Sequence, residues 1–142
     1  MLLTASLTVL LVALSTFIHY EVLRLCNENL PRLAVEGRAK VLLAMGAGFG
    51  SHLVQIALFA AAYRFLYEIG MGSLRGQIHN ASLSLLYFSA ETYTSLGFGD
   101  VYPVGEMRLI AGIEALTGLL MIGWTASFTY LEMSRYWVAP RR

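Results

Sequence analysis

Three long stretches with almost no charged side chains constrain this chain more than any other feature. Residues 1–20 and 41–63 contain no Asp, Glu, Lys or Arg, and residues 109–131 contain only Glu114. A helix of about 20 residues rises about 30 Å, which matches the hydrocarbon core of a bilayer. Because backbone polar groups in hydrocarbon must find partners within their own segment, the three stretches predict membrane-spanning helices.

The composition agrees with this interpretation. Of the 142 residues, 57% are hydrophobic and 13% are charged, which is about half the charged fraction of a typical soluble domain. An ordinary soluble enzyme and a disordered chain are therefore excluded. The net charge of +1 and the single cysteine, Cys26, indicate no nucleic-acid partner, no intrachain disulfide framework and no cysteine-rich zinc site.

The basic residues predict how the chain is oriented in the cell membrane. Most of them lie in the connector between the first two stretches and at the C-terminus: Arg24, Arg32, Arg38, Lys40, Arg135, Arg141 and Arg142. Since cytoplasmic loops are rich in Lys and Arg, we expect the connector and the C-terminus inside and the N-terminus outside. The first stretch has no basic region before it and no clean cleavage site after it, so we favour a retained helix over a cleaved signal peptide.

A fourth apolar stretch is too short to cross a bilayer. Residues 76–90 carry no formal charge and are followed by Glu91 and a glycine-rich segment. This length predicts a re-entrant or buried segment. Asn80 can cap a helix that begins near Ala81, and we expect that helix to end before Gly97.

Two glycines follow this short helix at alternate positions, Gly97 and Gly99. Glycine takes a positive φ without steric cost, so the segment can turn successive carbonyl oxygens to one side. A row of such oxygens can replace the hydration shell of a cation. One row cannot surround an ion, so the arrangement predicts an oligomer with a central axis.

Residues 91–103 resemble the end of the pore helix and the selectivity filter of the potassium channel family. They read Glu-Thr-Tyr-Thr-Ser-Leu-Gly-Phe-Gly-Asp-Val-Tyr-Pro, where the family has Glu-Thr-x-Thr, then Thr-Val-Gly-Tyr-Gly-Asp and x-x-Pro. The likeness covers about residues 41–134 and is greatest to small bacterial channels with two helices around a pore loop. It implies an all-α homotetrameric membrane protein, without enzyme activity, that conducts K⁺ passively and holds K⁺ ions but no organic cofactor.

The same resemblance implies a division of the chain. Residues 1–37 are expected to form an additional N-terminal transmembrane helix with a cytoplasmic connector, and residues 38–142 the pore domain. Within the pore domain we expect an outer helix over 38–66, a pore helix over 81–94, the filter over 95–100 and an inner helix over 107–134.

Residue roles follow from the resemblance by position. Carbonyl groups of the filter are expected to hold K⁺, from the segment Ser95, Leu96, Gly97, Phe98 and Gly99. Filter support is expected from Glu91, Thr94, Asp100 and Phe88. We expect the ion cavity to be lined by Leu119, Ile122, Ala126, Ser127 and Tyr130, and gating hinges at Gly118 and Gly123. For Gly118, close helix packing through a small residue is an equal alternative.

Three filter residues depart from the family pattern. Ser95, Leu96 and Phe98 stand where the family has Thr, Val and Tyr. Phe98 has no hydroxyl group and neither has Phe88, its expected pore-helix partner, so we expect an apolar contact and a less rigid filter. A weakly selective monovalent cation channel is therefore one alternative. A non-conducting helical membrane subunit is another, and a membrane enzyme is a third.

Three acidic residues are expected near the short helix. Glu91 and Asp100 are expected to share a proton or a bridging water, with one pKa raised, or else to lie apart and solvated. Glu114 is expected to face protein behind the pore helix.

Polar and small residues inside the spans also need explanation. His52 and Gln55 are expected to form interhelical hydrogen bonds, with a proton relay as the alternative. His19 is expected at the inner membrane interface. Gly46 and Gly50 are four residues apart and are expected to pack helices closely.

Overall fold

The computed structural model describes residues 1–78 and 81–137. Its elements in chain order are α1 (Leu2–Asn29), the 3₁₀ turn η1 (Leu30–Arg32), α2 (Gly37–Glu68), β1 (Gly72–Gly76), α3 (Ala81–Tyr93), β2 (Val101–Gly105) and α4 (Met107–Tyr136). The described part of the chain is mostly helical, as predicted. Asn80, the predicted cap of the short helix, lies outside the described residues, as do Arg141 and Arg142.

Within the described residues, three segments are long and apolar enough to cross a membrane, with 31, 32 and 30 residues: Leu2–Arg32, Gly37–Glu68 and Met107–Tyr136. At about 1.5 Å per residue each reaches about 45 Å, more than the hydrocarbon core of about 30 Å. Between 28% and 33% of each apolar window is buried within the chain. Most of this apolar surface therefore needs lipid or further protein to cover it, which agrees with a multi-pass membrane protein.

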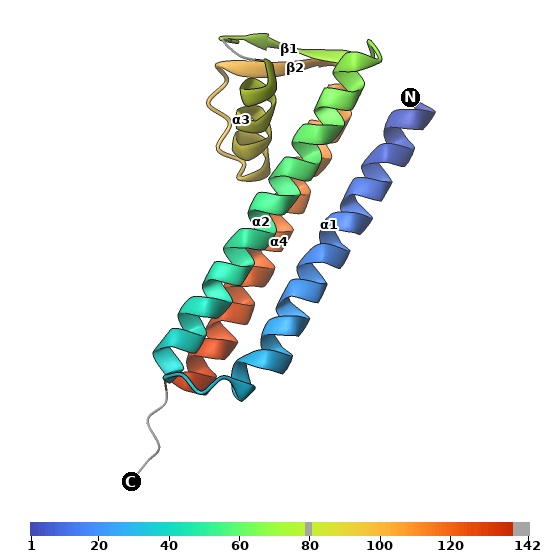
Figure 1. The fold of residues 1–142 in the computed structure, drawn as a ribbon. Helices are drawn as coiled ribbons and strands as arrows, with labels where there is room; N and C mark the ends of the chain where they lie inside the picture. Colours follow the sequence, from blue (N-terminus) through green and yellow to red (C-terminus); the bar gives the residue numbers. More distant parts are fainter. Residues whose placement is uncertain (79–80, 138–142) are drawn as a thin grey trace.

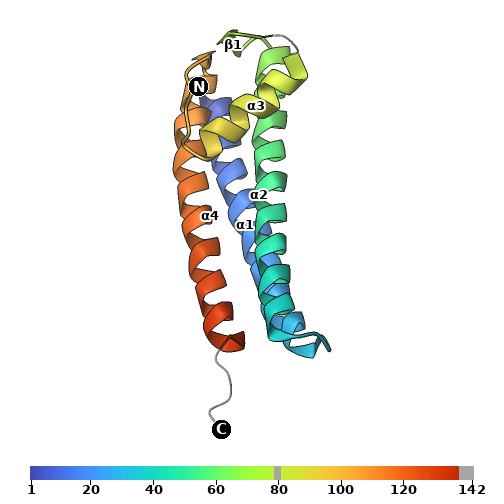
Figure 2. The same cartoon turned by 90° about the vertical axis from the view of Figure 1, so that its left-hand side faces the viewer.

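The long helices α2 and α4 form a central pair, with α1 on one side and α3 on the other (Figure 1). The view turned by 90° places α3 in front of this pair and α1 behind it (Figure 2). The start of α1 lies at the same end of the bundle as the two strands, and the connector lies at the opposite end with the end of α4. At the connector end the Lys40 ammonium lies 5.2 Å from the centroid of the Tyr136 ring.

A two-stranded hairpin covers the end of the bundle from which α3 descends, and the sequence pattern does not predict it. β1 pairs antiparallel with β2, from Gly72 opposite Gly105 to Gly76 opposite Val101. Gly76 has a φ of +114°, and a Cβ there would lie 2.0 Å from the Asp100 carbonyl oxygen. Glycine is therefore required where the two strands bring the ends of the α3 segment together.

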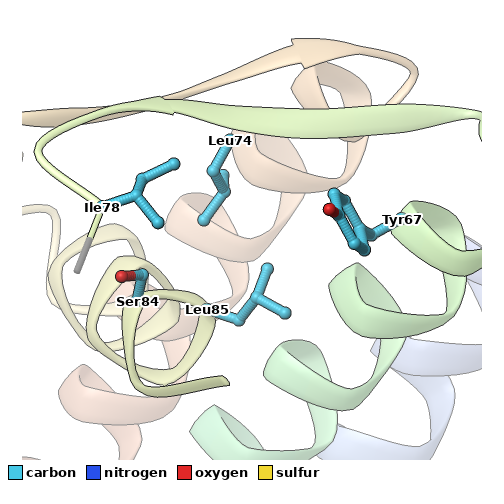
Figure 3. A pocket seen from close by; sticks show the side chains of 5 residues that line it. All are labelled: Tyr67, Leu74, Ile78, Ser84 and Leu85. Carbon is cyan, nitrogen blue, oxygen red and sulfur yellow. The ribbon is translucent and has the colours of Figure 1, made fainter. Parts of the chain in front are cut away.

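Apolar side chains fill the space between the hairpin, α2 and α3. Leu74 and Ile78 point from β1 and the following loop toward Ser84 and Leu85 on α3, with Tyr67 of α2 beside them (Figure 3). They surround a small cavity of about 110 Å³. The hairpin thus fixes the start of α3 against the end of α2.

Two glycines allow unusually close approach between elements. A Cβ on Gly118 of α4 would lie 1.9 Å from the Tyr93 carbonyl oxygen at the end of α3. A Cβ on Gly48 of α2 would lie 2.7 Å from the Thr125 methyl group on α4. A Cβ on Gly46 or Gly50, which were predicted to pack helices, would meet no other element of the described chain within 4 Å, so within one chain Gly48 serves that role instead.

Candidate functional site

The helix α3 ends in a left-handed cap. The Ser95 N–H donates to the Thr92 carbonyl at 2.9 Å, and the Leu96 N–H donates to the Glu91 carbonyl at 2.8 Å. Ser95 has a φ of +57°. This is the pattern of a Schellman motif, although the left-handed position is usually occupied by glycine. The cap stops the helix and starts the segment that resembles a filter.

The sign of φ alternates along this segment. Ser95, Gly97 and Gly99 have φ values of +57°, +56° and +80°, whereas Leu96 and Phe98 are not among the positive-φ residues. In an extended strand successive carbonyls point to opposite sides, and alternation in φ removes that constraint, so that consecutive carbonyls can face one side. Positive φ at both glycines is as predicted, and that at Ser95 is an addition. The whole segment 94–99 is exposed in the single chain.

The two acids beside this segment have separate hydrogen-bond partners. The Phe98 N–H donates to Glu91 Oε2 at 3.2 Å, and the Tyr87 hydroxyl donates to the two Asp100 carboxylate oxygens at 3.1 and 3.2 Å. Burial raises the pKa of the Glu91 carboxyl, the Phe98 N–H opposes that rise, and the Asp100 charge adds to it. Glu91 thus supports the backbone directly. Tyr87, a polar side chain one turn before Glu91, was not predicted from the sequence.

The apolar side chains of the segment are uncovered within one chain. Leu96 and Phe98 are 59% and 65% exposed. Phe88, the expected partner of Phe98, is instead buried and packs edge-on against Tyr63 with ring centroids 5.1 Å apart. Large exposed apolar side chains on a membrane protein's short loop indicate a surface that another element covers.

A buried acid holds α3 to the long helices. Both oxygens of the Glu114 carboxyl on α4 accept hydrogen bonds, one from the Tyr63 hydroxyl of α2 and one from Ser89 Oγ of α3 at 2.5 Å. Ser89 Oγ also lies 2.8 Å from the Ile56 carbonyl oxygen. We call Glu114, Tyr63 and Ser89 the acid cluster. Glu114 faces protein behind the short helix, as expected. Its partners were not predicted, although each facing helix carries a polar side chain, Tyr63 on α2 and Ser89 on α3, that could have indicated them.

Two histidines meet near the end of α3, one turn beyond Ser89. His52 Nδ1 lies 2.9 Å from the Tyr93 hydroxyl, which donates to Gln55 Oε1 at 2.9 Å, so the predicted interhelical hydrogen bonds are present. The expectation for His19 is wrong. Its ring is fully buried, 5.1 Å from that of His52 by centroids, because α1 packs against both α2 and α4 rather than ending at that depth.

An apolar groove of about 620 Å³ opens beside the end of α3. Its lining includes three of the predicted cavity residues and one predicted support residue: Ile122, Ala126, Tyr130 and Thr94. The other two predicted cavity residues, Leu119 and Ser127, lie outside this lining and are exposed on α4. Of the two predicted hinges, Gly118 is packed against Tyr93, whereas a Cβ on Gly123 would meet no other atoms within 4 Å.

Comparisons with known proteins agree with this geometry. A family profile described as "Ion channel" matches residues 51–133, which is more than half of the chain. Protein LctB of Bacillus caldotenax is 39% identical over 77 residues, which cover 49% of this chain and 58% of that protein. The chain therefore spans little more than half the length of this relative. No solved structure matches the chain. The match runs from the middle of α2 through α3 and its loop into α4, and the chain belongs to the ion channel family of the two-transmembrane potassium-channel type.

Proposed function

We propose that this protein conducts K⁺ passively and selectively across the cell membrane through a homotetrameric pore. The observation that carries the proposal is the alternating φ of Ser95, Gly97 and Gly99, in a segment that follows a short helix between two spans. Carbonyl groups of residues 95–98 would replace the hydration shell of K⁺, with Gly99 closing the filter. The Ser95 hydroxyl would add an innermost ligand.

The proposed assembly follows from what one chain leaves incomplete. A single segment offers carbonyl groups from one direction only, so a ring of subunits must complete the coordination. The exposed side chains of Leu96 and Phe98 would then pack against the neighbouring subunits. Four copies around one axis are the stoichiometry implied by the family resemblance.

The remaining roles are proposed on the same basis. Residues of α4 that face the groove would line the ion path below the filter, with Leu119 and Ser127 completing it in the tetramer. Glu91, Thr94 and Asp100 would support the filter backbone. The domain division at residues 37 and 38, and hinge motion at Gly118 and Gly123, are part of the proposal. The N-terminus would lie outside and the C-terminus in the cytoplasm, because the basic side chains gather at the connector end of the bundle.

Reversal potentials test the proposal. The purified protein in a lipid bilayer under opposed K⁺ and Na⁺ gradients is expected to reverse near the K⁺ equilibrium potential. Gly97→Ala is expected to abolish selective conduction, since Gly97 needs a φ of +56° and alanine opposes it by about 1 to 2 kcal/mol. Gly46→Ala is the matched control, because Gly46 is helical and meets no neighbouring atoms. Potassium selectivity retained in Gly97→Ala would refute the filter assignment.

Two alternatives are separated by the same preparation. The side chain of Phe98 has no hydroxyl and is 65% exposed, which favours a filter less firmly held and hence a weakly selective cation channel. Equal permeability to K⁺ and Na⁺ would establish that alternative. A non-conducting membrane subunit would give no flux, and crosslinking of it would stop at a dimer rather than reach a tetramer.

A further inference from the structure

Five polar side chains from all four helices form a closed ring of contacts at the end of α3. We call His19, His52, Gln55, Tyr93 and Thr125 the polar ring. Thr125 Oγ1 lies 3.1 Å from His19 Nε2 and 2.8 Å from His52 Nε2. His52 Nδ1 lies 2.9 Å from the Tyr93 hydroxyl, which lies 2.9 Å from Gln55 Oε1. Gln55 Nε2 lies 3.3 Å from His19 Nδ1 and closes the ring.

The hydrogens of the ring can be assigned from its donors and acceptors. Tyr93 donates its one hydrogen to Gln55, so its oxygen accepts from His52 Nδ1–H. His52 Nε2 then accepts from the Thr125 hydroxyl, whose oxygen accepts from His19 Nε2–H. His19 Nδ1 accepts from the Gln55 amide. All five hydrogen bonds run in one direction around the ring, and both histidines are neutral.

The ring can accept an extra proton at His52 Nε2. Thr125 Oγ1 also lies 3.1 Å from the Met121 carbonyl oxygen, so its hydroxyl can turn its hydrogen there and accept from both imidazoles. His19 is less accessible to protons, because its ring is fully buried and its Nδ1 faces the Gln55 amide N–H at 3.3 Å and Ser51 Oγ at 3.1 Å. His52 is half-buried and lines the apolar groove, so a proton can reach it.

Groups facing His52 permit a single proton. The ring of His19 on α1 has its centroid 5.1 Å away, and Tyr93 of α3 and Thr125 of α4 contact His52 through hydrogen bonds. The Glu114 carboxyl interacts electrostatically with Tyr93, which in turn contacts His52. Two imidazolium ions at this separation would repel each other. The ring therefore holds at most one added positive charge, at the wall of the groove.

We propose that His52 is a positioning residue for the filter and a proton site whose occupation lowers conduction, and that α1 belongs to this device through His19. The inference rests on the proposed function, in which the groove borders the ion path. The position of His52 links the proton site to the pore in two ways. A charge on His52 repels cations from the groove, and Tyr93, which His52 holds, packs its carbonyl against Gly118 directly before the filter segment.

Recordings at varied pH test the regulatory part. With pH changed on each side of the bilayer in turn, the wild-type current is expected to fall on acidification, in a step between about pH 5 and pH 8. His52→Gln is expected to remove the step while the tetramer still forms. Thr125→Val is expected to alter it and Thr125→Ser to restore it. His79→Gln changes the remaining histidine of the sequence and is the matched control that keeps the step. A step that persists in His52→Gln, or is lost in His79→Gln, would overturn the proposal.

The ring itself has a readout that does not depend on conduction. Nitrogen-15 NMR of labelled histidines in lipid at pH 8 is expected to show the Nδ1–H tautomer for His52 and the Nε2–H tautomer for His19. Any other combination overturns the ring as assigned. If the wild type shows these tautomers but no current at any pH, the proposed channel function fails and proton control of conduction fails with it, whereas the ring stands.

Discussion

The acid cluster and the polar ring hold the same short helix, α3, in different ways. The acid cluster uses one carboxyl, Glu114, with donors from two helices. The polar ring uses neutral groups in a closed circle and includes α1 through His19. Glu114 is fully buried, while His52 faces the groove. The two contacts hold neighbouring turns of α3: the one at Ser89 is sealed within the helices, and the one at Tyr93, next to the filter segment, borders the groove.

The cost of removing one member therefore differs between the acid cluster and the polar ring. A buried acceptor that receives two hydrogen bonds leaves its donors unsatisfied when it is removed, at a cost of about 1–3 kcal/mol for each buried group. In the ring each member both donates and accepts, so one loss interrupts a circle whose other bonds can reorient. We therefore expect larger effects on folding from the acid cluster and larger effects on pH dependence from the ring.

Gly118→Ala is expected to have the largest effect, since it displaces the helix that both clusters hold. The new Cβ would lie 1.9 Å from the Tyr93 carbonyl oxygen, and backbone cannot yield as a side chain can. We expect a loss of about 3 kcal/mol in the free energy of unfolding, measured by denaturation in detergent. Gly123→Ala meets open space and is the control, with a small gain in helix stability. Equal stability of the two variants would show that α3 does not approach α4 as described.

Glu114→Ala comes next and isolates the acid cluster. It leaves the buried Tyr63 hydroxyl without its acceptor and is expected to lower the free energy of unfolding by about 1–3 kcal/mol. Glu114→Gln is the control, because its amide oxygen can accept from Tyr63 while its N–H donates to Ser89, whose hydroxyl hydrogen then turns to the Ile56 carbonyl oxygen 2.8 Å away. Thermal unfolding of the two variants measures the difference. If Glu114→Gln were as unstable as the alanine variant, the negative charge rather than the hydrogen bonds would matter.

Gly48→Ala is expected to have a smaller effect on stability and to act through the ring. The added Cβ would lie 2.7 Å from the Thr125 methyl group, so the Thr125 side chain must turn. We expect a cost of about 1 kcal/mol and a changed pH step in the current. Gly50→Ala, which meets no neighbouring atoms, is the control. An unchanged pH step in Gly48→Ala would separate Thr125 from the proton response.

The sequence predicted those features that depend on one segment at a time. Charge-free stretches predicted three long helices, and the spacing of Gly97 and Gly99 predicted positive φ at both. Of the features that need two distant segments, the interhelical hydrogen bonds of His52 and Gln55 were predicted, whereas the hairpin and the place of His19 were not. The hairpin pairs residues 72–76 with 101–105, and neither strand is long enough to show an alternating pattern. His19 was misplaced because its depth depends on how α1 packs, which no local pattern in the first span reveals.

Ser51→Ala is expected to have the smallest effect and marks the boundary of the ring. Ser51 Oγ accepts from Gln55 Nε2 at 3.1 Å and lies 3.1 Å from His19 Nδ1, but none of the five ring bonds passes through it. Its removal is expected to cost about 1 kcal/mol or less and to leave the pH step in place. Ser15→Ala is the control, since Ser15 Oγ is buried without a hydrogen-bond partner in the described chain. Loss of the step in Ser51→Ala, measured beside His52→Gln, would mean that protons pass through Ser51 and that the ring is larger than five residues.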